Sequence, residues 1–311
     1  MAVTPGGMAK GRKAHAGSLR SVVIIGSSGF LGSHLRQRLA MGKSPPAIFE
    51  FNSRGECQAE FEELLKRAKP DAIFHMAGVV ASSDPQELNE GNVLHLERML
   101  KGTMNKAPPA LFIAMGSSAV YGICRKLPIS ESAPLAPITP YGVSMQARST
   151  LLESYSRRGL ATIEARLFNV IGPGISEKTS VGSFLKQIAA IRAGKAPAVL
   201  KTGYLGNKRD FIDVRDAVEA LVRLSEKQPK SQRIFNLCSG HSVPMQEVVE
   251  KMIQLSGVDI SLQTEAQRVQ KSDMPDNLGD NHLLKKETGW APSYPLDKSL
   301  EFALKKTILS A

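Results

Sequence analysis

The chain has 311 residues, of which 42% are hydrophobic and 22% are charged. This is an ordinary globular composition, and the length allows one large α/β domain or such a domain with a smaller lobe. The longest apolar runs, such as residues 22–25, suit buried strands and are too short to span a membrane. No signal peptide is evident, and three cysteines without metal-like spacing predict free thiols, no metal site and a cytoplasmic location.

A net charge of +11 restricts the partners that the chain is expected to bind. Residues 1–20 are rich in Gly, Ala, Lys and Arg, and they are predicted to form a disordered basic tail. A basic balance suits nucleic acid and small anions such as nucleotide diphosphates equally well. Aromatic residues make up only 5% and no RNA-binding signature is visible, so a small anion is expected rather than nucleic acid.

From residue 21 onward, short apolar runs alternate with amphipathic stretches in the pattern of successive βαβ units. The predicted strands are residues 22–25, 47–51, 72–76, 110–115, 163–168 and 234–237. The predicted helices are residues 31–40, 59–67, 92–101, 140–158 and 214–227. This alternation predicts an α/β fold with a doubly wound parallel sheet covered by helices on both faces.

The pattern changes after the glycine- and proline-rich residues 172–174. The later segments are predicted to be loop-rich, with short helices at 184–192 and 245–255, and to form a smaller C-terminal lobe. A last helix at 299–309 is expected to pack back on the main body. The sheet domain is assigned residues 21–170 and 210–240, and the substrate-binding lobe is assigned residues 171–209 and 241–311.

Three glycines directly follow the first predicted strand. Residues 26–32 read Gly-Ser-Ser-Gly-Phe-Leu-Gly and lead into the first amphipathic helix. Glycine permits the tight turn and the close approach of a diphosphate, while the helix N-terminus offers free N–H groups to phosphates. The sequence therefore predicts a Rossmann dinucleotide-binding domain. The predicted cofactor contacts in this turn are Gly26, Ser28, Gly29, Phe30, Leu31 and Gly32.

The end of the second predicted strand bears on the choice between the two nicotinamide cofactors. Glu50 lies where an acid hydrogen-bonds the adenosine ribose hydroxyls, which favours NAD. Arg54 follows closely, and an arginine there either pairs with the 2′-phosphate of NADP or is simply a solvated loop cation. NAD is the expected cofactor, with NADP as the alternative.

Five further motifs, in order along the chain, resemble those of the extended short-chain dehydrogenase/reductase family, the NAD-dependent epimerase/dehydratase family. They are residues 75–78, 116–122, 140–144, 166–174 and 209–216. Within the family, the segments that are similar to those of GDP-4-keto-6-deoxy-mannose reductases are 116–118, 140–144, 236–240 and 286–292. The resemblance implies an NAD(P)-dependent homodimeric enzyme that acts on a nucleotide-diphosphate sugar, GDP- or dTDP-linked rather than UDP-linked.

The resemblance also implies roles for individual residues. Ser117 takes the position of the catalytic Ser/Thr, whose hydroxyl holds the sugar oxygen, and Tyr141 takes the position of the general acid/base and contacts the cofactor. Asn169 and Arg209 take positions that hold the diphosphate. Further implied contacts are Met76, Ala77, Gly78 and Asn92 to the cofactor and Ser118 to the substrate. Without the resemblance, Ser117 is equally a turn former and Tyr141 the start of a helix.

The position four residues after Tyr141 departs from the family pattern. The family has a lysine there, one helical turn on, whose ammonium lowers the pKa of the tyrosine and hydrogen-bonds the nicotinamide ribose. Here the residue is Met145, whose thioether carries no charge and donates no hydrogen bond. Tyr141 is therefore expected to titrate near its unperturbed pKa of about 10. A neutral tyrosine can still donate a proton, so Met145 favours reduction, altered chemistry or lost catalysis, unless it is simply a core residue.

Two further departures bear on the reaction. Ser118 and Ala119 stand where nucleotide-sugar 4,6-dehydratases carry an Asp-Glu pair, which argues against dehydration. Gln270 stands where the family has a diphosphate-binding arginine, and Arg268 or Lys271 is the expected substitute. The predicted function is reduction of a nucleotide-linked 4-keto-6-deoxy sugar. The alternatives are a nucleotide-sugar 4-epimerase and a catalytically weakened module that binds the cofactor and the sugar nucleotide.

Overall fold

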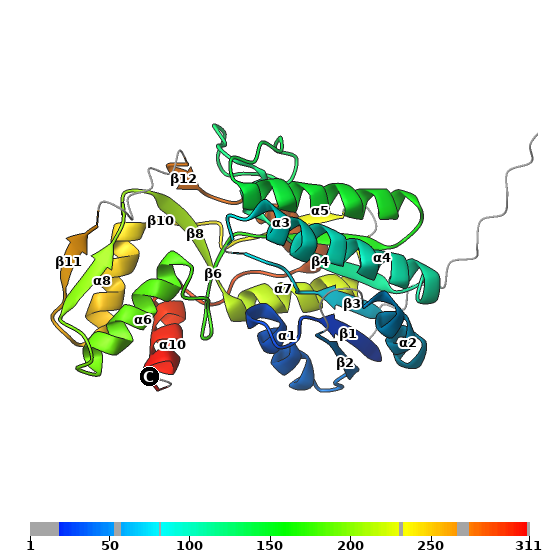
Figure 1. The fold of residues 1–311 in the computed structure, drawn as a ribbon, viewed down its shortest axis with the longest axis horizontal. Helices are drawn as coiled ribbons and strands as arrows, with labels where there is room; N and C mark the ends of the chain where they lie inside the picture. Colours follow the sequence, from blue (N-terminus) through cyan, green and yellow to red (C-terminus); the bar gives the residue numbers. More distant parts are fainter. Residues whose placement is uncertain (1–18, 53–56, 81, 230–232, 266–273, 310–311) are drawn as a thin grey trace, which may run out of the picture.

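The central sheet of the computed structural model has six parallel strands in the order β2-β1-β3-β4-β5-β9 (Figure 1). Their bounds are β1 Ser21–Ile25, β2 Ala47–Phe51, β3 Ala72–His75, β4 Leu111–Ser117, β5 Thr162–Leu167 and β9 Ile234–Leu237. The predicted parallel α/β fold is thus confirmed. The structure describes residues 19–52, 57–80, 82–229, 233–265 and 274–309, so the predicted tail lies outside it up to residue 18.

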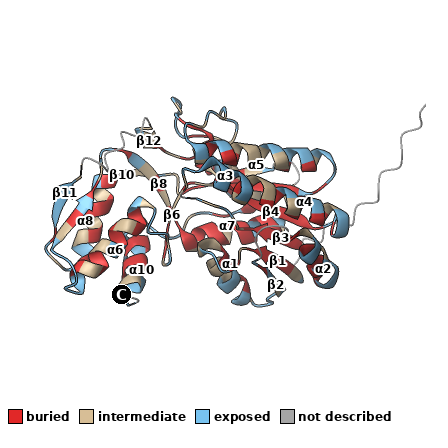
Figure 2. Ribbon diagram, viewed as in Figure 1, coloured by how far each residue is buried: buried red, intermediate tan, exposed pale blue. Residues whose placement is uncertain are grey.

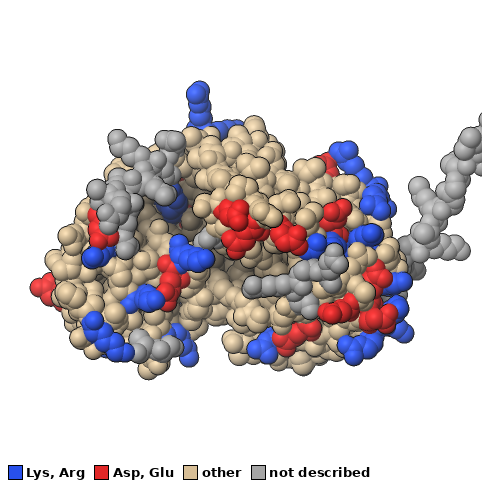
Figure 3. Space-filling model, in the orientation of Figure 1, with Lys and Arg blue, Asp and Glu red and all other residues tan. Residues whose placement is uncertain are grey.

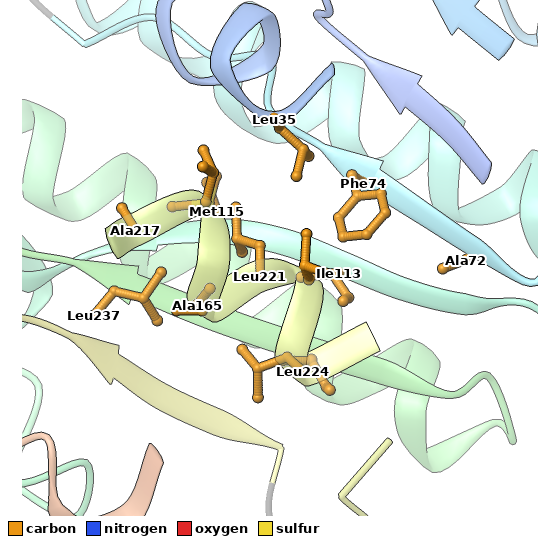
Figure 4. Packing of buried hydrophobic residues seen from close by; sticks show 14 of the residues in the cluster. Leu35, Ala72, Phe74, Ile113, Met115, Ala165, Ala217, Leu221, Leu224 and Leu237 are labelled. Carbon is orange, nitrogen blue, oxygen red and sulfur yellow. The ribbon is translucent and has the colours of Figure 1, made fainter. Parts of the chain in front are cut away.

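Alternate side chains of the central strands point to opposite faces of the sheet, so β1, β3 and β4 each contribute to two hydrophobic cores. On one face, Phe74 and Ile113 pack in a cluster with Leu35 and Leu221 from the helices that cover it (Figure 4). The helices are α1 Phe30–Ala40 and α7 Val214–Lys227, and they also contact each other.

The opposite face of the sheet is covered by three helices, α2 Gln58–Ala68, α4 His95–Lys106 and α5 Pro140–Arg157. α4 is preceded by α3 Pro85–Leu88 and the π-helix η1 Asn89–Leu94, so helical structure begins earlier than predicted. α5 begins at its predicted position because Pro140 suits the first turn and Thr139 Oγ1 accepts the Gly142 N–H at 3.0 Å. Figure 2 shows the buried residues concentrated on the sheet and on the helix sides that face it.

The smaller lobe contains more strand structure than its loop-rich sequence predicts. One sheet has the order β10-β8-β12, with β6 also paired to β8, and β7 pairs with β11. The bounds are β6 Asn169–Ile171, β7 Val199–Thr202, β8 Lys208–Asp213, β10 Ser242–Pro244, β11 Ser261–Thr264 and β12 Asp276–Asn277. The sequence pattern misses these strands because all except β8 have four residues or fewer, too few to establish a period.

Three helices form the core of the lobe: α6 Ser180–Arg192, α8 Met245–Ser256 and α10 Leu296–Leu309. Leu185, Val249 and Leu300 are buried together in their cluster. The last helix packs mainly on α6 and α8 within the lobe rather than on the main body as predicted (Figure 1). It contacts the sheet domain through Phe302, whose ring centroid lies 4.3 Å from Cζ of Arg215 on α7. Within the described ranges, no helix is both long enough and apolar enough to cross a membrane.

Residues 282–290 pack on the sheet domain, although they fall in the range 241–311 that the sequence assigns to the lobe. Helix α9 His282–Thr288 contacts α7 and β9. Leu284 and Trp290 are buried in the core beneath α7, and Trp290 Nε1 donates a hydrogen bond to the Asp216 carbonyl at 3.0 Å. The chain therefore returns to the sheet domain before it enters α10.

Candidate functional site

The turn between β1 and α1 approaches other backbone so closely that only glycine fits at two positions. Gly26 has a φ of +81°, and a Cβ on it would lie 2.8 Å from the Ala77 amide nitrogen. A Cβ on Gly32 would lie 2.1 Å from the Gly26 carbonyl oxygen. Gly29 precedes α1 without a side-chain cap, which leaves N–H groups of the first helical turn to bind an anion. This geometry fits the diphosphate of a dinucleotide.

Glu50 lies beside this turn, near the end of β2. Its Oε2 accepts a hydrogen bond from Ser27 Oγ at 2.6 Å, and its Oε1 lies 3.5 Å from Nη1 of Arg36 on α1. An acid and a cation thus share the region where the adenosine ribose of a dinucleotide is expected. Arg36 was not identified from the sequence, and Arg54 lies outside the described residues.

A cavity of about 900 Å³ separates the sheet domain from the smaller lobe, and Figure 3 shows the surface hollowed between the two. The predicted residues that line it are Phe30, Leu31, Met76, Ala77, Gly78, Asn92, Ser117, Ser118, Tyr141, Met145, Asn169 and Arg209. The predicted residues outside its lining are Gly26, Ser28, Gly29, Gly32 and Glu50, which lie in the turn or near the end of β2. Among the described residues, no three His, Cys, Asp or Glu side chains are placed to hold a metal ion.

Ser117 and Tyr141 bring two hydroxyl groups together at the cavity wall. Ser117 ends β4, directly before the short helix η2 Ser118–Val120, and Tyr141 lies in the first turn of α5. Burial raises the pKa of Tyr141 above its usual value of 10, although a hydrogen bond with Ser117 and the charge of Arg148 oppose the rise. The expectation of an unperturbed pKa is therefore wrong, because it left out the burial of the phenol.

Met145 lies one turn further along α5 and borders the same cavity. Its side chain is buried in a small apolar cluster with Val120, Tyr121 and Phe168, against which Tyr141 packs. The thioether brings neither a charge nor a hydrogen-bond donor to this wall. Met145 is therefore at once a core residue and a neighbour of the candidate site.

Arg148, two turns after Tyr141 on α5, is a buried cation at this cavity that was not identified from the sequence. Its Nη1 donates to the Asn92 carbonyl at 3.0 Å, and its Nη2 donates to the Met115 carbonyl at 3.0 Å. Nη2 also lies 3.3 Å from His75 Nδ1. The signal available in the sequence was the spacing of seven, because residues seven apart lie on the same side of a helix.

Two polar side chains on the lobe side of the cavity form hydrogen bonds with nearby carbonyls. Asn169 Nδ2 donates to the Asp210 carbonyl at 3.1 Å, and Arg209 Nη1 donates to the Met274 carbonyl at 3.0 Å. Burial lowers the pKa of Arg209, and the charge of Asp276 opposes this effect. The two predicted substrate contacts thus lie on neighbouring strands, β6 and β8, at one wall.

Further polar side chains line the cavity without any motif to mark them, among them Asn277 and Lys178. Asn277 on β12 donates from Nδ2 to Ser118 Oγ at 3.3 Å, and its Oδ1 has no hydrogen-bond partner among the described residues. Lys178 lies in the segment before α6 and is exposed. The predicted contact Arg268 lies outside the described residues, as do Gln270 and Lys271.

Comparison with known proteins finds a matching family and relatives similar in sequence and in structure to this chain. A family model described as the NAD dependent epimerase/dehydratase family matches residues 22–238. GDP-6-deoxy-D-mannose reductase of Pseudomonas aeruginosa is 30% identical over 290 residues, which cover 90% of this chain and 95% of that protein. The structure of RMD from Pseudomonas aeruginosa complexed with NADPH aligns with a TM-score of 0.85 and 27% identity, covering 94% of this chain and 100% of that chain.

Other relatives have different reactions in their names. dTDP-6-deoxy-L-talose 4-dehydrogenase (NAD(P)(+)) of Kitasatospora kifunensis is 25% identical over 306 residues, which cover 90% of this chain and 93% of that protein. UDP-glucose 4-epimerase of Lactobacillus helveticus is 26% identical over 314 residues, which cover 88% and 92%. The shared features of these names are a nucleotide sugar and chemistry at its C4 position.

Proposed function

The chain belongs to the NAD dependent epimerase/dehydratase family, and we propose that it reduces the 4-keto group of a nucleotide-linked 4-keto-6-deoxy sugar. The family comprises NAD(P)-dependent enzymes that modify nucleotide sugars. The observation that carries the proposal is the Tyr141 phenol, which meets the Ser117 hydroxyl at the cavity and has a raised pKa. A phenol that stays protonated is ready to donate a proton, as reduction of a ketone requires.

Ser117 and Tyr141 have separate parts in the proposed reaction. NAD(P)H, when bound, supplies the hydride that adds to the carbonyl carbon. Ser117 donates a hydrogen bond that holds the carbonyl oxygen in place. Tyr141 transfers its phenolic proton to that oxygen, which becomes the hydroxyl of the product, and a proton from solvent then restores the phenol.

The two ends of the cavity are proposed to hold two different diphosphates. The glycine turn, residues 26–32, suits the cofactor diphosphate because it presents the N-terminus of α1. Asn169 and Arg209 suit the diphosphate of the sugar nucleotide, since a partly buried guanidinium gains from an anionic partner. A GDP- or dTDP-linked sugar is proposed because the two reported relatives with a 6-deoxy sugar in their names carry it on GDP or dTDP.

The pair of Glu50 and Arg36 is proposed to let the site accept either cofactor. The Glu50 carboxylate suits the ribose hydroxyls of NAD, and the Arg36 guanidinium suits the 2′-phosphate of NADP. Both side chains are partly exposed beside the glycine turn, so either can contact the ribose of a bound dinucleotide. The NADPH bound to RMD and the name of the talose dehydrogenase support this dual use.

A 4-epimerase is the second candidate, because UDP-glucose 4-epimerases are among the relatives. An epimerase first removes a proton from the sugar hydroxyl, so it needs a phenolate at the start. Burial of Tyr141 disfavours the phenolate and outweighs the opposing charge of Arg148, and Met145 adds no charge of its own. These two features favour reduction over epimerisation.

The test is consumption of NADH or NADPH with a panel of GDP- and dTDP-linked 4-keto-6-deoxy sugars. The expected result is turnover to a product with two more hydrogen atoms, identified by mass spectrometry, and loss of turnover in Tyr141→Phe. Conversion of UDP-hexoses without net cofactor consumption would identify an epimerase instead. A folded protein that binds NAD(P)H and sugar nucleotides without turnover would be a binding module, and the proposal would be wrong.

A further inference from the structure

Arg148 and Tyr141 share one side of α5. Seven residues correspond to almost two full turns, about 10 Å along the helix axis. Side chains on a helix lean toward its N-terminus, so the long arginine side chain at position 148 extends back toward Tyr141. Its contacts agree with this direction, because its guanidinium reaches the Asn92 carbonyl and would lie 4.0 Å from a Cβ on Gly78. Both of these residues also line the cavity.

The guanidinium of Arg148 is buried without a salt bridge to a described acid. The residue is only 1% exposed, and no described carboxylate forms a salt bridge with it. Its Nε has no hydrogen-bond partner among the described residues, and its other contacts are two carbonyls and an imidazole. A buried cation is costly unless an opposite charge compensates it. An arginine kept in this state therefore points to a negative charge that forms only at some stage of function.

The titratable groups around Arg148 leave one candidate for that charge. His75 on β3 has a pKa well below its usual value because of burial, so it is a neutral acceptor, and it contacts His95 on α4. The charge of Glu164 on β5 also raises the pKa of Arg148, but Glu164 forms its salt bridge with Arg166, whose Nη2 lies 3.1 Å from Glu164 Oε2. The remaining group is Tyr141, whose effect on the pKa of Arg148 is larger than that of Glu164.

The electrostatic effect between the two residues operates in both directions. The charge of Arg148 lowers the pKa of Tyr141, and Tyr141 in turn raises the pKa of Arg148. Burial is the larger effect on the arginine and lowers its pKa to about 10. The guanidinium therefore keeps its proton at neutral pH and acts as a positive charge.

We propose that Arg148 supplies the positive charge that is missing at Met145. This charge stabilises the Tyr141 phenolate that is left after proton donation. Arg148 is thus a positioning residue, because it acts on the reaction through Tyr141. The part of this inference that concerns turnover rests on the proposed function. The ionisation of Tyr141 does not, since it is measurable in the protein without any substrate.

The test is a titration of Tyr141 by tyrosinate absorbance in the near ultraviolet. The chain has five tyrosines, so the difference between each protein and its Tyr141→Phe counterpart isolates this phenol. Arg148→Gln removes the charge but keeps amide donors for the backbone carbonyls, and Arg148→Lys keeps the charge with fewer donors. We expect the midpoint to rise by about one pH unit in Arg148→Gln and to stay near that of the parent in Arg148→Lys. An unchanged midpoint in folded Arg148→Gln would overturn the proposal, as would equal shifts in both variants.

Met145→Lys provides a second test that keeps Arg148 in place. Beside the guanidinium, a new ammonium is disfavoured by like-charge repulsion, so its effect on the Tyr141 midpoint is expected to be small. In the double variant Met145→Lys/Arg148→Gln, the ammonium is the only cation of the pair. It should reverse the rise in the Tyr141 midpoint that Arg148→Gln causes. If Arg148→Gln does not fold, Met145→Lys alone decides: a fall of about one pH unit would mean that the site had lacked a charge and would overturn the proposal. A protein that reduces no 4-keto sugar but shows these midpoints would refute the proposed function only.

Discussion

The glycine turn after β1 and the first half of α5 border one cavity but provide positive potential by different means. The turn uses backbone N–H groups, whose positions depend on Gly26 and Gly32. Helix α5 uses side chains on one face, with Met145 uncharged and Arg148 charged. The glycine turn allows no other residue at its two tight positions, whereas a side-chain charge can be supplied from another turn of the same helix. The cofactor end of the site thus depends on glycine at fixed positions, whereas the charge at the proton-transfer end can come from more than one position on α5.

The largest effect is expected when the phenol of Tyr141, at the proton-transfer end of the site, is removed. Tyr141→Phe should lower kcat for reduction roughly a thousandfold, because the only proposed proton donor is lost. Affinity for NAD(P)H, measured by fluorescence titration, should change little, since the cofactor diphosphate is proposed to bind at the glycine turn. A loss of less than tenfold would show that another group donates the proton.

The role of the glycine turn in cofactor binding is tested by adding a methyl group at Gly32. A Cβ there would lie 2.1 Å from the Gly26 carbonyl oxygen, so the turn must shift. We expect Gly32→Ala to weaken NAD(P)H binding roughly a hundredfold, as measured by isothermal titration calorimetry. The matched control is Gly42→Ala, whose Cβ would meet its nearest neighbour at an ordinary 3.6 Å. Equal binding by both variants would mean that the turn does not hold the cofactor.

A smaller effect is expected where one side chain contacts the sugar nucleotide. Arg209→Gln should raise KM for the sugar nucleotide about tenfold with a smaller change in kcat, because a charge-assisted hydrogen bond to the diphosphate is lost. Lys208→Gln, at the exposed neighbouring position on β8, is the control for a general change in surface charge. Steady-state kinetics that show the same rise in both variants would leave Arg209 without a specific role.

The smallest expected effect concerns cofactor choice. Arg36→Gln should lower kcat/KM for NADPH about fivefold relative to NADH, because a partly exposed cation contributes modestly. Glu50→Gln should shift the preference in the opposite direction, since it removes a negative charge near the 2′-phosphate. If the ratio of the two kcat/KM values stays constant in both variants, other residues select the cofactor.

The two regions also differ in how well the sequence predicts them. The glycine turn is local, so its three glycines and the strand before them indicate both the conformation and the ligand. The sequence likewise indicates Ser117 and Tyr141, because each lies in a continuous motif at an element boundary. The short strands of the lobe escape prediction, and with them Asn277, which meets Ser118 only through the pairing of β12 with β8.

Arg148 was missed for a different physical reason. An arginine on a helix is ordinarily expected at the surface, and its burial depends on carbonyls from β4 and η1 that only the tertiary structure provides. The same limit applies to the pKa of Tyr141, which depends on the burial of its phenol against residues such as Val120 and Phe168. Position in the sequence shows which residues can share a helix face, but not which face is buried.

The most direct test of the central claim, that Tyr141 donates the proton for ketone reduction, is the pH dependence of kcat with a GDP-linked 4-keto-6-deoxy sugar and NAD(P)H. The active form is the protonated phenol, and burial raises its pKa, so activity is lost only as the pH rises through that raised value. The account predicts a constant kcat through neutral pH and a fall only above about pH 10, the usual pKa of tyrosine. A kcat that rises with pH through the neutral range, as a required base loses its proton, would contradict it.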